Sequence, residues 1–309
     1  MAGSPKQNYS GPPGAGDFGL LMLLGAIWGM SFLFIKVAVE TIPALPMTTL
    51  RLAFSVILMV GAMVWLGHRL PRFGPIWIAV FVSALFGNVL PFLLIAWGQE
   101  KVDAGLGAIL MSPSPLMAAA LAHFFTSDEK LNGWKLAGIG LGMVGVVVLM
   151  GLDKLGGLGG DGVRQLAIIS AGAGYAINSV ANRGLTGGSA VGNITAVMIV
   201  SFAMLAPVTL VLPDVWQFSP SVASMSALAA IVVFSTCLGT LLMLALVRRQ
   251  GAAFTAQVNF LVPMFGVVWG TLFLAERPTI RSLIGLVLIL AGVAVARQGS
   301  GLRPAAGRS

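Results

Sequence analysis

The sequence predicts an all-α integral membrane protein with ten transmembrane helices, arranged as two inverted five-helix repeats around a central cavity. Three observations predict this fold class: an apolar composition, ten apolar runs of membrane-spanning length, and a duplication of the chain. Hydrophobic residues make up 57% of the 309 residues and charged residues only 9%, whereas soluble domains carry roughly 25% charge. The chain is therefore expected to lie in a lipid bilayer.

Ten apolar runs have the length that a helix needs to cross a bilayer core, roughly 20 residues. Clusters of charged residues, Pro and Gly separate them. The runs predict helices over residues 18–39, 46–66, 75–97, 104–125, 133–151, 162–182, 190–212, 221–247, 251–274 and 279–296. The net charge of +8 does not indicate nucleic-acid binding, because most Lys and Arg residues are scattered singly between these runs and indicate topology instead.

The second half of the chain matches the first at a shift of about 147 residues. The matched pairs are Trp28 with Tyr175, Lys36 with Arg183, Lys101 with Arg248, Glu129-Lys130 with Glu276-Arg277, Gly138 with Gly285, and Gly145 with Gly292. Each copy contains five spans, an odd number, so the second copy must face the opposite way across the bilayer. Inverted repeats of this kind commonly support alternating access in transporters.

The duplication sets the predicted organisation of the chain. A polar N-terminal tail covers 1–17, the first repeat 18–151, a linker 152–161, the second repeat 162–297 and a C-terminal tail 298–309. Lys and Arg are more numerous on the side that holds both tails, so the positive-inside rule predicts cytoplasmic termini. The first apolar run lacks the short h-region and cleavage site of a signal peptide, so no cleaved leader is expected.

Prolines in three runs predict helix breaks or gating points beside the cavity. Pro115 and Pro263 occupy matching positions in the fourth and ninth runs, and Pro91 lies in the third. A proline inside a helix frees a backbone carbonyl, and a pair of interrupted helices is the sequence sign of a transporter site. A plain kink satisfied by nearby Ser hydroxyls is the alternative. The polar neighbours taken as candidate substrate ligands are Asn88, Ser112, Ser114, Gln257 and Asn259.

The sixth run carries a single polar stripe at helical spacing, and the matching face of the first run adds two further candidates. The stripe consists of Tyr175, Asn178, Ser179 and Asn182, and the first run contributes Trp28 and Ser31. Polar groups in hydrocarbon need partners, so the stripe faces either neighbouring helices or a substrate, and both readings stay open. A Tyr opposite a Trp favours flat apolar or aromatic ligands, or a cation over the ring face.

Charged residues lie mostly at the ends of the runs. No carboxylate lies deep in any run, although proton-coupled antiporters commonly need one. His123 is the substitute to consider, but an interfacial position is expected for it. Lys36 and Arg183 either attract a substrate carboxylate at the two mouths or extend to the headgroups. Arg51 is read in the same way, with a structural pairing to a loop acid somewhat more expected.

Other residues argue for packing and against catalysis. Glycines in the fifth and tenth runs predict close helix packing: Gly138, Gly142, Gly145, Gly285 and Gly292. Two His, one Cys and no deep carboxylate leave little for acid–base, nucleophilic or metal chemistry. We therefore expect no enzyme activity, no cofactor and no bound metal.

With these residues in view, the chain resembles the EamA family of the drug/metabolite transporter superfamily. The likeness rests on Trp28-Gly29 with Phe32 and Lys36, on Arg51-Leu52-Ala53-Phe54, and on a Pro followed about fourteen residues later by an acidic-basic pair and a Gly-rich helix in both halves. It covers essentially all ten runs. Asp128-Glu129 and Ala275-Glu276 stand where the family often has Gly-Glu.

The resemblance implies a carrier of a bacterial inner membrane that holds a small-molecule substrate, with the fifth and tenth spans away from the cavity. The first run looks most like that of bacterial amino-acid exporters, which implies export of aromatic or other neutral amino acids with weak or no ion coupling. One alternative is an exporter of hydrophobic or quaternary cations. Another, from a different class, is a non-transporting membrane scaffold or sensor subunit, which an open, water-accessible cavity would exclude.

Overall fold

The computed structural model describes residues 12–125, 131–150 and 161–298, and all regular structure within them is helical. Most of the two predicted tails, most of the linker, and the Glu129-Lys130 pair lie outside these ranges. The first half contains α1 (Ala15–Ala38), α2 (Ala44–Trp65), α3 (Ile76–Ala84), η1 (Leu85–Val89), α4 (Leu90–Gln99), α5 (Ala104–Met111), α6 (Ser114–Phe125) and α7 (Gly133–Met150).

The second half repeats this succession of helices. It contains α9 (Asp161–Ala181), η2 (Asn182–Gly184), α10 (Ala190–Leu210), η3 (Pro213–Trp216), α11 (Val222–Ala230), η4 (Ile231–Leu238), α12 (Gly239–Thr255), α13 (Val258–Leu274) and α14 (Ile280–Gln298). Eight helical stretches of the described chain are long and apolar enough to cross a membrane, and α13, with 17 residues, is shorter.

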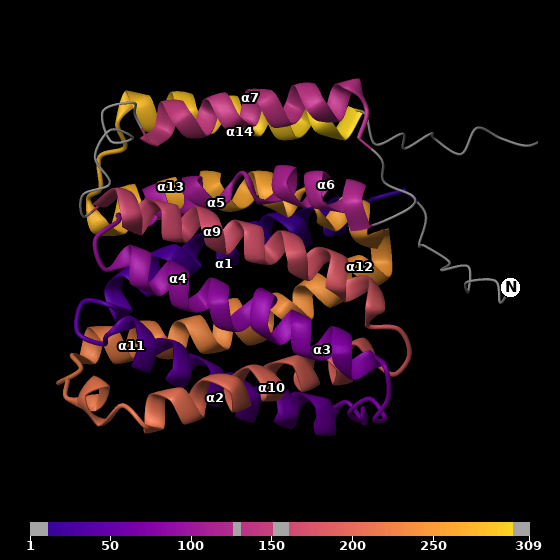
Figure 1. Cartoon of the computed structure of the whole chain (residues 1–309), viewed down its shortest axis with the longest axis vertical. Coiled ribbons are helices and arrows are strands. Elements are labelled where there is room, and N and C mark those ends of the chain that lie inside the picture. The colour runs from indigo at the N-terminus through magenta and orange to yellow at the C-terminus, as the bar shows by residue number, and fades with distance from the viewer. Residues whose placement is uncertain (1–11, 126–130, 151–160, 299–309) are drawn as a thin grey trace, which may run out of the picture.

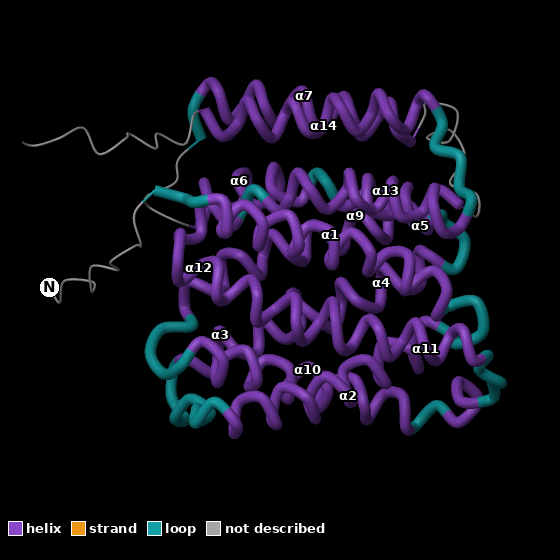
Figure 2. Tube along the Cα trace, turned by 180° about the vertical axis from the view of Figure 1, so that it is seen from behind, coloured by secondary structure: helices purple, strands orange, loops and turns teal. Residues whose placement is uncertain are grey.

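The helices lie roughly side by side in layers (Figures 1 and 2). The pair α7 and α14 forms one edge of the bundle, and α2 and α10 form the opposite edge. Between them, α1 packs on α13, and α9 packs on α4 and α6. Large apolar side chains such as Leu24, Leu52 and Ile168 are fully buried between these layers.

Glycines allow α7 and α14 to touch, as the sequence predicts. A Cβ added at Gly138 would overlap the carbonyl oxygen of Gly292, and one added at Gly145 would lie 3.0 Å from the carbonyl oxygen of Gly285. The contacts pair the beginning of α7 with the end of α14, so the two helices are antiparallel. A larger residue at either contact would separate them.

The third and eighth predicted runs each contain a wide π-helical turn, η1 and η4, at corresponding positions. The sequence did not predict these turns. Turns of this type lengthen the hydrogen-bonded ring and often accompany functional sites. Pro91 follows η1 in the first turn of α4, so its missing N–H falls where the helix is already irregular.

The break predicted at Pro263 is wrong, whereas the fourth run does break at Ser112-Pro113, just before Pro115. Pro263 lies inside the continuous helix α13. The carbonyl left without its amide partner belongs to Asn259, an exposed residue that water can reach. The chain instead interrupts its helical path at Gly251, whose φ of 83° suits glycine, and at the short junction before α13.

Both described ends of the chain lie at the same end of the bundle (Figure 1). Near the start of α1, the Asp17 carboxylate accepts a 2.8 Å hydrogen bond from the side chain of Gln250. Near the end of α14, the Arg297 guanidinium donates a 2.7 Å hydrogen bond to the Ala256 carbonyl. We call the end of the bundle that holds Asp17 and Arg297 the terminal end.

Candidate functional site

A cavity of about 560 Å³ lies at the centre of the bundle, and helices of both halves line it. This is within the size range of small-molecule sites. In the described chain, no residue of α7 or α14 belongs to its wall, as the family resemblance implied. The wall is mainly apolar, with a small number of polar groups.

The cavity opens at the terminal end of the bundle. Four of its lining residues are exposed: Ser179, Asn182, Ala252 and Asn259. Ala252 lies two residues after Gln250, and the side chains of Arg249 and Gln250 contact Asp17 near the start of α1. The mouth therefore lies at the terminal end.

The opposite end of the cavity is closed by buried apolar side chains. Phe32, Ile35 and Ile95 line the cavity with exposed fractions of 6%, 2% and 4%. They belong to a continuous cluster that also contains Val39 and Ile42. Water in the cavity therefore meets a packed barrier at this closed end.

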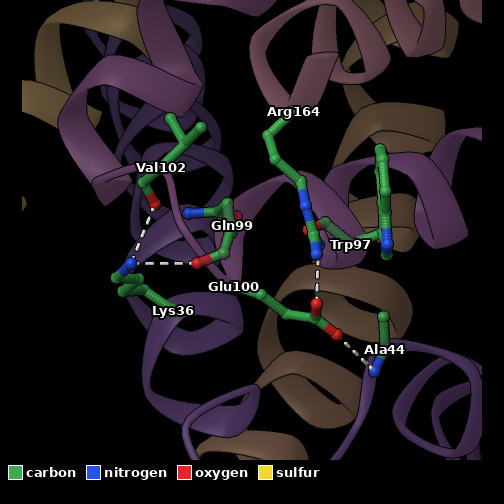
Figure 3. Close-up of polar contacts among 7 residues, drawn as sticks. All are labelled: Lys36, Ala44, Trp97, Gln99, Glu100, Val102 and Arg164. Carbon is green, nitrogen blue, oxygen red and sulfur yellow. Dashed lines mark hydrogen bonds and ion pairs between the residues drawn. The ribbon is translucent and has the colours of Figure 1, made fainter. Parts of the chain in front are cut away.

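Polar contacts reinforce the closed end (Figure 3). The Lys36 ammonium donates to the carbonyls of Gln99 and Val102 at 2.9 and 3.0 Å, which satisfies the C-terminus of α4. The fully buried Gln99 side chain donates to the Phe32 carbonyl at 2.9 Å. Lys36 is thus occupied with backbone groups and does not line the cavity.

An ion pair at the same end joins the two halves. Arg164 of α9 lies 2.6 Å from the carboxylate of Glu100 and also donates to the Trp97 carbonyl. The Arg164 guanidinium covers the Trp97 ring at 3.9 Å, and Glu100 accepts a hydrogen bond from the backbone N–H of Ala44. Three helices, α9, α4 and α2, are therefore held together here.

All four residues of the predicted stripe line the cavity, and they are only partly paired. Ser179 donates to the Ala176 carbonyl at 2.7 Å, and Asn182 accepts from the Ser83 hydroxyl at 3.1 Å. The buried Oδ1 of Asn178 has no hydrogen-bond partner within the described chain. The stripe thus combines interhelical bonding with a fully buried Asn178 oxygen, and its exposed members are Ser179 and Asn182.

The candidates from the first half also line the cavity, although their polar groups are more fully bonded. The Trp28 indole donates to the Ser235 carbonyl at 3.1 Å, and the Ser31 hydroxyl donates to the Trp28 carbonyl. Ser112 and Ser114 donate to the carbonyls of Ile109 and Gly172. These bonds use the hydroxyl hydrogens and leave oxygen lone pairs available.

The wide turns contribute to the wall at corresponding positions. Asn88 of η1 lines the cavity, and its side-chain amide donates a 3.0 Å hydrogen bond to the hydroxyl of Ser201. Ser235 of η4 lines the cavity from the other half. Pro115, Pro263 and Asn259 also line the cavity. Gln257 and Pro91 are absent from the wall: Gln257 lies at the junction before α13, and Pro91 packs near Gly174.

The remaining charged candidates lie outside the cavity wall. His123 accepts a 3.1 Å hydrogen bond from the Leu131 amide near the end of α6, and Arg183 is exposed in η2. No carboxylate within residues 12–125, 131–150 and 162–298 lines the cavity. Over the part of the chain that the structure describes, no cluster of three His, Cys, Asp or Glu side chains could hold a metal.

Arg51 is a charged residue of the cavity wall that the predicted site omitted. It lies in α2, is 6% exposed and lines the cavity. The expected pairing to a loop acid is wrong within the described residues, since both ion pairs found there involve other arginines. The available signal was a lone Arg in an apolar run, which a sequence alone cannot assign to a cavity or to a partner.

Comparison with known protein families finds a match in each half of the chain. The model of the EamA-like transporter family matches twice, over residues 17–151 and 164–298. The two matches begin 147 residues apart, the same shift that relates the halves in the sequence.

Individual relatives are similar over nearly their whole length. They include the "Uncharacterized inner membrane transporter YedA" of Escherichia coli (23% identical, covering 93% of this chain and 92% of the relative) and the "Uncharacterized transporter YvbV" of Bacillus subtilis (27%, 93% and 93%). A "Probable amino-acid metabolite efflux pump" of E. coli is 26% identical and covers 89% and 92%. One solved crystal structure superposes with a TM-score of 0.63 at 18% identity, covering 93% of this chain and 98% of its own.

Proposed function

The chain belongs to the EamA-like transporter family and is a membrane transporter, and we propose that it exports small zwitterionic metabolites, chiefly neutral or aromatic amino acids, by alternating access across a bacterial inner membrane. The observation that carries this proposal is the central cavity, which is open at one end and sealed at the other. A carrier needs such a compartment, whereas a scaffold has no use for it.

Two inverted repeats, 18–151 and 162–297, supply the proposed mechanism. Contacts recur between equivalent residues: Gly25 lies against Leu261, and Gly172, which is 147 residues after Gly25, lies near Ser114, which is 147 residues before Leu261. An internal two-fold relation of ten spans would make the closed end a second possible mouth. Exchange of the two arrangements would then move the substrate across the membrane.

The direction of transport follows from the proposed topology. If the positive-inside rule holds, both termini are cytoplasmic, and the mouth at the terminal end faces the cytoplasm. The closed end then faces the periplasm. A substrate would enter from the cytoplasm and leave after the Arg164–Glu100 pair and the apolar barrier separate.

The wall supports an amino acid as the cargo. Trp28 and Tyr175 provide apolar ring surface, while the hydroxyl oxygens of Ser31 and Ser179 keep lone pairs that accept hydrogen bonds. The efflux-pump relative supports the same substrate class. Because no described carboxylate lines the cavity, we propose a carrier with weak or no proton coupling.

A counterflow assay tests the proposal. Purified protein in liposomes loaded with unlabelled neutral amino acids should accumulate the labelled amino acid transiently, and protein-free liposomes should not. A panel of aromatic, aliphatic and basic amino acids, with a quaternary ammonium compound, defines the substrate class. Absence of counterflow for every amino acid, together with uptake of the quaternary cation, would favour the cation exporter instead.

A further inference from the structure

The Arg51 guanidinium is held rigidly in the cavity wall. Its Nε donates to the Thr236 hydroxyl at 3.1 Å, and its central carbon lies 3.6 Å from the centre of the Phe92 ring. The first contact fixes one edge of the planar group, and the second fixes its face. The orientation of the group is therefore set before any ligand arrives.

The other edge of this group has no partner in the described chain. The Nη1 and Nη2 atoms donate no hydrogen bond to the described residues. Neither atom is completely buried, so both remain accessible. The side chain nevertheless belongs to a residue that is 94% buried and lines the cavity. Four N–H donors thus remain for a ligand in the cavity.

A buried positive charge without a counter-ion carries a large desolvation cost. A ligand with a negative group offsets this cost and is therefore favoured. No ion pair of the described residues includes Arg51: Glu100 binds Arg164, and Asp17 binds Arg249 and Gln250. An Arg fork matches a carboxylate in a two-bond geometry. A cation in the same cavity would instead be repelled, because the low local dielectric strengthens like-charge repulsion.

We propose that Arg51 binds the carboxylate of the transported molecule, so that the cavity accepts carboxylate-bearing substrates and rejects organic cations that lack this group. This assignment rests on the proposed export function and narrows its substrate class. Arg51 would thus determine specificity, while the aromatic walls contact the side chain of the substrate.

The first experiment needs no variant. Unlabelled analogues of one aromatic amino acid compete with labelled phenylalanine in counterflow: phenylalanine itself, phenylalaninamide, which lacks the carboxylate, and 3-phenylpropionate, which lacks the ammonium group. We expect the amide to compete at least about tenfold more weakly than phenylalanine, as expected for loss of a charged, desolvated contact. Equal competition by the amide would overturn the assignment.

The second experiment removes the guanidinium. Arg51→Gln should raise the half-maximal phenylalanine concentration about tenfold or more and should abolish the discrimination against phenylalaninamide. Arg51→Lys keeps the charge without the fork and should give an intermediate value. Arg72→Gln, at an exposed position before α3, is the matched control and should behave as wild type.

The outcomes separate this assignment from the proposed function. Wild-type counterflow of amino acids with unchanged affinity in a folded Arg51→Gln protein overturns the role of Arg51 and leaves export intact. No counterflow of any amino acid by the wild type overturns the proposed function itself. If Arg51→Gln does not fold, as judged by size-exclusion chromatography, the Arg51→Lys variant tests the residue, and equal competition by phenylalaninamide on the wild type still overturns the assignment.

Discussion

The guanidinium of Arg164 and the carboxylate of Glu100 lie 2.6 Å apart at the closed end of the cavity, with 19% and 25% of their side chains exposed. This pair must separate if that end opens. A partly exposed ion pair contributes about 1 kcal/mol or less. Arg164→Gln should therefore raise the population of molecules open at this end up to about fivefold.

A cysteine reporter checks this prediction. Ile35→Cys, in a Cys237→Ser background, places a thiol in the apolar barrier, and an impermeant maleimide added on the side of the closed end reports opening. Arg164→Gln should label faster than its parent. Arg277→Gln, at an exposed position shortly before α14, serves as the control. Identical labelling rates in all three proteins would show that the pair does not hold the barrier closed.

Glu276 should stabilise the contact between the halves. Its carboxylate accepts hydrogen bonds from the backbone N–H groups of Ala104 and Gly105, at 2.7 and 2.8 Å, at the N-terminus of α5. Negative charge at a helix N-terminus is favourable. Glu276→Gln should cost about 1–2 kcal/mol and lower the Tm in detergent. Glu40→Gln, at an exposed position, should leave the Tm unchanged, and an equal Tm for both variants would contradict this role.

The contact between α7 and α14 should depend on the absence of side chains. A methyl group at Gly138 would overlap backbone atoms of Gly292 and Ala296, whereas a methyl group at Gly140 meets nothing within 4 Å. Gly138→Ala should destabilise the protein by about 1–3 kcal/mol. Gly140→Ala, on the same helix, should not. Thermal unfolding of the two variants in one detergent gives the comparison, and equal melting would mean that the helices do not pack as described.

Transport should depend little on a pH difference across the membrane. The described residues place no carboxylate in the cavity wall, and His123 lies outside it beside the Leu131 amide. The initial rate of neutral amino-acid transport should be the same with and without an imposed pH gradient, and His123→Gln should retain it. A rate that rises strongly with an inward proton gradient and falls in His123→Gln would contradict weak coupling.

Local patterns predicted the helices and much of the cavity wall, because both follow from neighbouring residues. The stripe of Tyr175 and Asn178 lies on one helical face by spacing alone, and the glycines of α7 could pack only where no bulk intervenes. The continuous helix through Pro263 was not predictable, since it depends on what can satisfy the freed carbonyl. The sequence left Arg51 open between a substrate carboxylate and a structural partner for a similar reason: whether it has a partner depends on residues distant in sequence.

The proposed mechanism requires one cavity to open alternately at its two ends. In a Cys237→Ser background, Ser179→Cys reports the open end and Ile35→Cys reports the closed end, each labelled by an impermeant maleimide from its own side. Adding a transported amino acid should change the two labelling rates in opposite directions. If Ser179→Cys labels and Ile35→Cys stays protected under every substrate condition, the cavity does not alternate and the account is contradicted.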